Sequence, residues 1–300
     1  MRIVVALGGN ALSPANEPFD IDVQRVRIRA TAAHIAALCG THEIVVTHGS
    51  GPQVGHLASL ALPRQTPPAF PLDILDAATD ALIGYEIERA LRSAAPEIAT
   101  ATLLTMVEID PADPAFARPS KPIGPVYPAE RAAELERVHG WTLHAVPGGV
   151  RRVVASPQPR RILEVPAVHA LLDSNHLVIA CGGGGIPVRR DGSELTGAEA
   201  VIDKDRVSAM LARDIDADAL LLLTDVDGVY RDWPAPMADR IDRIDSTALA
   251  GQHFDVGSMG PKVEAACTFA HTGTGFAAIG RLDDLPRLAE GRAGTIVAGT

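Results

Sequence analysis

The sequence predicts an α/β sandwich with a mainly parallel sheet, and three observations support this fold class. Short apolar runs recur along the chain without polar alternation, which is typical of strands buried on both faces. Several of these runs end directly in glycine or aspartate. Amphipathic stretches with helical periodicity lie between the runs, and this alternation of strands and helices indicates right-handed crossovers.

The expected strands follow from the apolar runs in chain order. They cover residues 3–7, 43–47, 101–107, 151–154, 177–181, 219–223, 275–279 and 295–298. Four of these runs lead into the turn sequences GGN, HGSG, GGGG and TDVDG, in that order. Because the carboxyl ends of parallel strands meet at one edge of a sheet, where ligands bind, we expect these turns to share one rim.

Helices are expected between the strands. Residues 21–39 end at Gly40, and glycine commonly terminates a helix. Residues 73–94 carry apolar side chains at helical spacing, and Pro96 follows them. Shorter helices are expected over residues 129–139, 203–214 and 261–271.

One region interrupts this alternation. Residues 110–160 contain nine prolines, a density that resists both helices and central strands. We predict a stiff excursion from the sheet, with a short helix and a hairpin. Lys121 lies in this region, so the excursion is expected to form a lid over a site; the alternative is a proline-rich surface loop without a role.

Bulk composition limits the class of protein. The chain has 300 residues, 47% of them hydrophobic, which is enough for one large α/β domain or two smaller ones. Its formal net charge of −10 argues against nucleic acids and anionic membranes as main partners. No apolar run approaches membrane-spanning length, and the first one breaks at Gly8, too soon for a secretory signal. We therefore expect a soluble, cytoplasmic protein.

Cysteine and histidine give no sign of a metal site. The three cysteines, Cys39, Cys181 and Cys267, are far apart in the sequence and lack metal-ligand spacing. The ten histidines show no such spacing either. Buried thiols in a reducing cytoplasm are the expected state of the cysteines.

Lysine is unusually scarce. Only three of the 27 basic residues are lysines, namely Lys121, Lys204 and Lys262, and each lies among glycine, proline or aspartate. Lysine carries a compact charge, whereas arginine ends in a broad planar fork. A compact charge suits a tight site in which one oxygen of a phosphoryl group is neutralised. The alternative is that composition alone left three solvated lysines.

The glycine-bearing turns suggest a phosphate site that is spread over several segments. Glycine lets the backbone approach a phosphate, and helix N-termini add partial positive charge. The sequence ALGGNAL lacks the dinucleotide pattern G-x-G-x-x-G, and no G-x-x-x-x-G-K-[ST] phosphate loop occurs. A distributed site therefore fits better than a P-loop enzyme or a dehydrogenase.

Charged residues at two helix starts could belong to this site. Asp203 and Asp205 flank Lys204, and either carboxylate could be an ordinary helix cap. In the functional alternative Lys204 contacts a phosphate, and Asp205 orients lysines from both sides. Pro261 is expected at the first turn of the next helix, which puts Lys262 at a helix N-terminus. The TDVDG sequence is either a simple turn or part of a nucleotide pocket.

Taken together, these motifs resemble carbamate kinases of the amino acid kinase superfamily along nearly the whole chain. The resemblance rests on ALGGNAL (6–12), THGSGPQVG (47–55), IGY (83–85), DPAF and KPIGPVY (within 113–127), RRVVASPQP (151–159), GGGGIPV (182–188), EAVIDKD (199–205), TDVDGVY (224–230) and GSMGPKVEA (257–265). VIDKD, KPIGP and GSMGPK are highly specific in combination.

The resemblance implies a fold and an assembly. It implies one domain over residues 1–300, a three-layer αβα sandwich with a mainly parallel central sheet. A carbamate and phosphoryl lobe would cover about residues 1–215 and include a small protruding subdomain at about 112–155. A nucleotide-binding lobe would cover about 216–300. The resemblance also implies a homodimer.

The implied reaction is reversible phosphoryl transfer between ATP and carbamate, often used in cells to make ATP from carbamoyl phosphate and ADP. Mg²⁺ would be held mainly by the nucleotide phosphates. The residues implied in charge neutralisation and its organisation are Lys121, Lys204, Asp205 and Lys262. Those implied around the phosphoryl group and carbamate are Gly8, Gly9, Asn10, Gly49, Ser50 and Gly51. Those implied around the nucleotide are Thr224, Asp225, Asp227, Val229, Tyr230, Met259 and Gly260.

The chain departs from the family pattern in two places. Ser50 stands where the family usually has asparagine, and Thr79, Asp80 and Ala81 stand where it often has Ser-Gln-Gly. A carboxylate at Asp80 would repel an anionic substrate unless it faces away or is paired with an arginine. Two alternatives therefore stay open: a catalytically silent nucleotide-binding homologue that acts as a sensor, and a kinase for another small carboxylic acid.

Overall fold

The computed structural model describes residues 1–12, 20–60, 70–231, 239–252, 254, 259–272 and 275–299. The α-helices are α1 (Gly9–Leu12), α2 (Ile21–Ala36), α3 (Gly51–Leu60), α4 (Leu72–Ala94), α5 (Ala132–His139), α6 (Val165–Asp173), α7 (Lys204–Asp214), α8 (Ser246–Ala250), α9 (Met259–Thr272) and α10 (Leu285–Ala289). The strands are β1 (Arg2–Leu7), β2 (Glu43–His48), β3 (Thr100–Thr102), β4 (Met106–Ile109), β5 (Lys121–Tyr127), β6 (Thr142–Val146), β7 (Gly149–Val154), β8 (Pro159–Ile162), β9 (Leu177–Ile179), β10 (Ile186–Asp191), β11 (Glu194–Gly197), β12 (Ala219–Leu223), β13 (Val229–Arg231), β14 (Asp239–Ile241), β15 (Arg243–Asp245), β16 (Phe276–Gly280) and β17 (Thr295–Ala298).

The central sheet is mainly parallel, as predicted. Within the described residues it has eight strands in the order β15–β17–β16–β12–β1–β2–β9–β3. Neighbouring strands run parallel throughout, except for the antiparallel pair of β16 and β17. Smaller sheets flank it, among them β11–β10–β4–β8 and the β13–β14 pair. The expected α/β fold class is confirmed.

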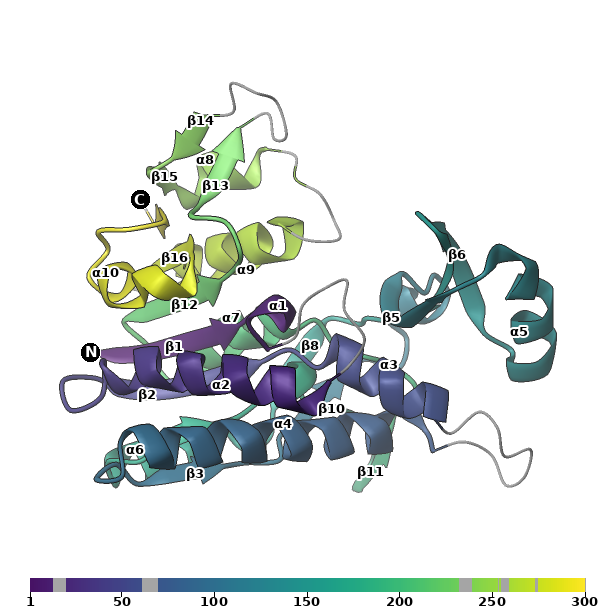
Figure 1. Cartoon of the computed structure of the whole chain (residues 1–300), viewed down its shortest axis with the longest axis horizontal. Helices are drawn as coiled ribbons and strands as arrows, with labels where there is room; N and C mark the ends of the chain where they lie inside the picture. The colour runs from purple at the N-terminus through teal and green to yellow at the C-terminus, as the bar shows by residue number, and fades with distance from the viewer. Residues whose placement is uncertain are drawn as a thin grey trace.

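Two hydrophobic cores lie on the two faces of this sheet. Alternate residues of β1 point to opposite faces, so that Val4 and Ala6 belong to one core and Ile3 and Val5 to the other. The first core also takes buried side chains from α6, α7 and α9, and the second from α2, α4 and α10. The sheet is thus covered by helices on both faces, which gives the three-layer sandwich (Figure 1).

Two of the expected strands lie elsewhere than the apolar runs suggested. The run at 101–107 is divided between β3, in the central sheet, and β4, in a flanking sheet. The chain turns at Thr105, whose hydroxyl accepts a hydrogen bond from the backbone N–H of Cys181 at 2.9 Å. The run at 151–154 is part of β7, which pairs with β5 and β6 and not with the central sheet. An apolar run alone does not indicate which strands it pairs with.

The proline-rich excursion forms a protruding sheet, defined here as β5, β6, β7 and α5. It stands apart from the central sheet at the right of Figure 1. Its strand order is β5–β7–β6, so β5 is an edge strand, and an edge tolerates the prolines of KPIGPVY because they need not donate to a neighbour. The expected short helix and hairpin are present as α5 and the β6–β7 pair.

Two glycines join the protruding sheet to the body of the protein. Gly55 on α3 lies against Gly124 on β5 so closely that a Cβ atom at Gly55 would be 2.0 Å from the Gly124 backbone. Gly124 has a φ of +71°, a left-handed conformation that favours glycine. The start of β5, which carries Lys121, is therefore held by direct backbone contact with α3.

Among the described residues, no helix is long and apolar enough to cross a membrane.

Candidate active site

The four predicted turns do share one rim. They follow β12, β1, β2 and β9, which are consecutive parallel neighbours in the central sheet. Residues from all four turns line a cleft of about 1360 Å³, among them Gly8, Gly9, Gly49, Ser50, Gly51, Gly183, Thr224 and Asp225. Its position at the carboxyl edge of the strands is the place where open α/β sheets bind ligands.

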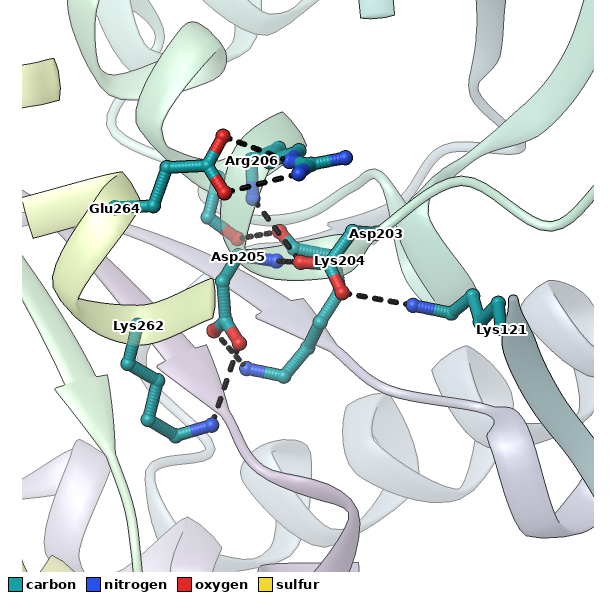
Figure 2. Close-up of polar contacts among 8 residues, drawn as sticks. Lys121, Asp203, Lys204, Asp205, Arg206, Lys262 and Glu264 are labelled. Atoms are coloured by element: carbon teal, nitrogen blue, oxygen red, sulfur yellow. Dashed lines mark hydrogen bonds and ion pairs between the residues drawn. The ribbon is translucent and has the colours of Figure 1, made fainter. Parts of the chain in front are cut away.

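The three lysines meet at the start of α7, although they come from β5, α7 and α9 (Figure 2). Lys121 Nζ donates to Asp203 Oδ2 at 2.8 Å. Lys204 Nζ donates to Asp205 Oδ1 at 2.5 Å, and Lys262 Nζ donates to Asp205 Oδ2 at 3.3 Å. Two carboxylates thus gather three ammonium groups, and all five residues line the cleft.

The two aspartates have different local roles. Asp203 is the N-cap of α7, since its Oδ1 accepts the backbone N–H of Asp205 at 2.9 Å, while its other oxygen holds Lys121. Asp205 holds Lys204 and Lys262. The helix-cap alternative therefore describes Asp203, and Asp205 holds two lysines as the functional alternative expected. The pairing of Asp203 with Lys121 was not expected from the sequence.

Burial and pairing set the charges of this cluster. Burial acts to raise the pKa of Asp205, but Lys204 and Lys262 outweigh it and hold the pKa below its ordinary value. Burial likewise acts to raise the pKa of Asp203, and Lys121 overcomes it and lowers the pKa. The pKa of Lys204 is lowered by burial, which Asp205 opposes. Both carboxylates are thus anionic at neutral pH, and three lysines face two negative charges.

The residues expected around the nucleotide divide into two groups. Thr224, Asp225, Tyr230 and Met259 line the cleft. Asp227, Val229 and Gly260 are not among its lining residues.

Asp227 and Val229 do not line the cleft, but each makes a structural contact. Val229 is fully buried and donates its backbone N–H to Thr295 Oγ1 at 2.7 Å. Asp227 accepts from the hydroxyl of Tyr230 at 2.7 Å and from Arg240 at 3.1 Å. Asp227 therefore orients a residue of the cleft and does not line it.

Some expected site residues fall where the structure describes little or nothing. Asn10 belongs to α1, and its side chain lies outside the described residues. Gly257 and Ser258 of the GSMGPK motif also lie outside them.

Sequence reasoning missed three arginines of the cleft. Arg27 lies on α2, Arg231 is the last residue of β13, and Arg281 directly follows β16; all three line the cleft. Arg281 Nε donates to the backbone carbonyl of Asp225 at 3.1 Å. A signal for Arg281 existed, because residues 275–279 were an expected strand and a parallel strand would end at the same rim. No motif marked Arg27, and Arg231 lies just beyond the end of TDVDGVY.

Comparison with known proteins identifies the family. The model of the amino acid kinase family matches residues 1–276. A carbamate kinase of Rhizobium meliloti is 48% identical over 302 residues, which cover 99% of this chain and 93% of that protein. This chain belongs to the amino acid kinase family, in its carbamate kinase branch. A carbamate kinase of Haemophilus influenzae is 45% identical, with 98% and 96% of the two chains covered.

Solved structures agree with this family assignment. The carbamate kinase of Giardia lamblia bound to AMP-PNP superposes with a TM-score of 0.90 at 33% identity, covering 100% of this chain and 98% of the other. A UMP kinase of Bacillus anthracis, at 16% identity and a TM-score of 0.57, shares the fold alone. The amino acid kinase fold is therefore present in this chain.

Proposed function

We propose that this protein is a carbamate kinase, which transfers a phosphoryl group reversibly between ATP and carbamate to give ADP and carbamoyl phosphate. The observation that carries the proposal is the meeting of Lys121, Lys204 and Lys262 at the rim formed by the glycine turns. Carbamate kinases of other organisms match this chain nearly end to end, which supports the same activity here.

The chemistry requires two anions to meet. A carbamate oxygen attacks the γ-phosphorus of ATP, the new P–O bond forms on the face opposite ADP, and the bond to the ADP oxygen breaks. Carbamate is already an anion, so no residue has to remove a proton. Catalysis then depends on positioning and on neutralising charge in a site with little water.

The lysines serve this purpose through their placement. Lys204 and Lys262 come from opposite sides of Asp205, with side chains only 11% and 12% exposed, so their charge is little screened by solvent. Lys121 starts β5 in the protruding sheet and lines the cleft, which supports the predicted lid function. The N-termini of α7 and α9 lie at the same cleft and add partial positive charge.

Mg²⁺ belongs to the proposal as a companion of the nucleotide. Asp203 and Asp205 are already paired with lysine ammonium groups. This pairing is consistent with a metal that is held by the nucleotide phosphates and arrives with them. When bound, the ion would neutralise phosphate charge. A homodimer, a cytoplasmic location and use in ATP formation are further parts of the proposal, supported by the likeness to the family and by the sequence.

The proposal is tested by ATP formation on the purified protein. With ADP, Mg²⁺ and carbamoyl phosphate, we expect ATP to appear, measured by a luciferase assay, and acetyl phosphate serves as the matched control donor. ATP formation from acetyl phosphate but not from carbamoyl phosphate would favour a kinase for another small acid. Nucleotide binding by calorimetry without turnover of either donor would favour the catalytically silent sensor.

A further inference from the structure

A buried pair of titratable side chains lies next to the cleft and is not used in the chemistry above. His48 is the last residue of β2, and Asp80 is on α4. Both are fully buried, and His48 Nε2 lies 3.7 Å from Asp80 Oδ1. Asp80 thus faces a histidine in the interior. The sequence left open whether this carboxylate is paired with an arginine, and its neighbour is a histidine instead.

The pair directly supports a turn that forms part of the cleft. A Cβ atom at Gly182 would lie 2.0 Å from Asp80 Oδ1 and 2.4 Å from His48 Nε2, so this turn rests on the two side chains. The next residue, Gly183, lines the cleft, and a Cβ there would lie 2.4 Å from Ser50 Oγ. One layer of backbone therefore separates the pair from the space where an anion would bind.

Several buried polar atoms of the pair and of the adjacent turn lack hydrogen-bond partners among the described residues. Asp80 Oδ2 accepts the backbone N–H of Thr105 at 3.3 Å. Within the described part of the chain, Asp80 Oδ1, His48 Nε2 and Ser50 Oγ have no hydrogen-bond partner. Unsatisfied buried atoms are costly, and a proton held between the carboxylate and the ring would satisfy two of them with a small approach.

The number of protons on the pair depends on pH. Burial raises the pKa of Asp80 to about 7, against the opposing effect of the backbone N–H groups of Thr105 and Gly182. Burial lowers the pKa of His48 to about 4. Between these values the pair carries one proton and is neutral, whichever group holds it. Above about pH 7 that proton is lost, and the pair carries one negative charge.

Other titratable groups face this pair from each neighbouring element. They are Asp76 on α4, Glu164 before α6, Cys181 after β9 and Lys204 on α7. Glu164 adds to the rise in the pKa of Asp80, and Lys204 adds to the fall in the pKa of His48. Burial raises the pKa of Asp76 and that of Cys181 well above their ordinary values, and the charge of Asp80 adds to both rises.

We propose that the Asp80–His48 pair is a positioning element that sets the charge beneath the anion-binding turns, so that loss of its shared proton weakens the binding of anions at Gly183 and Ser50. The inference rests on the proposed function only in placing the phosphoryl group at these turns. A negative charge behind Gly182 would repel a phosphoryl group across one backbone layer of low dielectric. The neutral pair presents no such charge.

Sulfate is the probe for the test, because it stays a dianion across the relevant pH range and needs no turnover. Its dissociation constant is measured by titration calorimetry from about pH 6 to pH 8.5. For the natural protein we expect the constant to rise by about five- to tenfold over this range. In Asp80→Asn, which is neutral at every pH and of the same shape, we expect it to stay nearly constant. Asp173→Asn, at an exposed carboxyl of α6, is the matched control and should behave as the natural protein does.

A second measurement does not depend on any variant folding. The nitrogen NMR signals of the His48 ring in the natural protein should shift with the same midpoint as the sulfate affinity. A sulfate affinity that does not change with pH, absence of sulfate binding at every pH, or equal pH dependence in Asp80→Asn would each overturn the inference. Carbamoyl phosphate turnover combined with a flat sulfate profile would refute this inference alone, whereas a titrating sulfate profile without turnover would refute only the proposed function.

Discussion

Asp205 connects two lysines that are 58 residues apart in sequence, and this connection determines which side chains the site accepts. Lys204 Nζ is 2.5 Å from Asp205 Oδ1, and its Cδ lies 3.5 Å from where a Cβ of Gly49 would be. A compact ammonium fits between the carboxylate and the glycine turn. The fork of arginine is broader and places its nitrogens differently.

Lys204→Arg and Lys262→Arg should therefore each lower kcat by roughly 10²–10³, the loss typical of removing one group that stabilises the transition state. Steady-state rates of ATP formation provide the measurement. Arg206→Lys is the control on the same helix, because Arg206 pairs with Glu264 at 2.9 Å and is not among the lining residues of the cleft. Near-normal turnover of either arginine variant would refute the role given to that lysine.

Among the individual site residues, the lysines could be predicted from the sequence better than their carboxylate partners. Scarcity of lysine marked Lys121, Lys204 and Lys262 because composition is visible without coordinates. The bond between Lys121 and Asp203 was not predicted, since 82 residues separate them. The pairing of Asp80 with His48 was missed for the same reason: neighbours in space are invisible in one sequence.

The contact of α3 with β5 controls where the protruding sheet lies. Gly55 and Gly124 touch through their backbones, and no side chain fits between them. Because Lys121 starts β5, a change in this contact moves a charge of the cleft without altering any residue that lines it.

Gly55→Ala should therefore impair both stability and activity. Its Cβ would fall 2.0 Å from the Gly124 backbone, so α3 and β5 must separate, at a cost of about 1–3 kcal/mol. We expect kcat/KM to fall by about tenfold or more, in line with small displacements of positioned groups. Urea unfolding and steady-state kinetics measure the two effects. Gly251→Ala is the control, because the nearest atom to its Cβ would be 3.8 Å away, and it should change neither stability nor kcat/KM. If Gly55→Ala also left both unchanged, the close contact of α3 with β5 would not be needed to position Lys121.

At the element scale, most strands and helices were predictable from apolar periodicity, and their partners were not. The runs at 219–223 and 295–298 coincide with β12 and β17. The antiparallel pairing of β17 with β16 could not be inferred, because an apolar run does not record the direction of its neighbour. The start of α9 at Met259, before Pro261, agrees with a proline in the first turn of a helix.

Asp76, a carboxyl buried on α4, affects the stability of the folded protein. Asp76 is 2% exposed, and neither of its oxygens has a hydrogen-bond partner among the described residues. Burial raises the pKa of Asp76 well above its ordinary value, with Lys121 opposing. A carboxyl whose pKa is raised by folding stabilises the folded state below the ordinary pKa and loses that contribution as pH rises through the folded-state pKa.

Asp76→Asn should therefore gain stability relative to the natural protein as pH increases. We expect the difference in unfolding free energy, measured with urea, to be larger at about pH 8 than at about pH 4.5, because asparagine never has to be kept neutral. Asp173→Asn, at an exposed site, should show no such trend. An equal difference at both pH values would mean that Asp76 ionises freely in the folded protein.

At the scale of the molecule, the fold class and the common rim were predictable, because both follow from strands that end in glycine turns. The cleft also depends on α2 and on the segment after β16, which carry Arg27 and Arg281. Arg27 and Arg281 reach the cleft because elements that are distant in sequence pack around the sheet. No local sequence pattern indicates this packing.

The placement of the lysines has a practical consequence. Every side-chain amine in this protein lies in a single cleft, since Lys121, Lys204 and Lys262 are the only lysines and all three line it. A reagent that acylates amines can thus modify only this cleft and the amino terminus. Mass spectrometry of the labelled protein would then report occupancy of the cleft directly, residue by residue, without an assay of turnover.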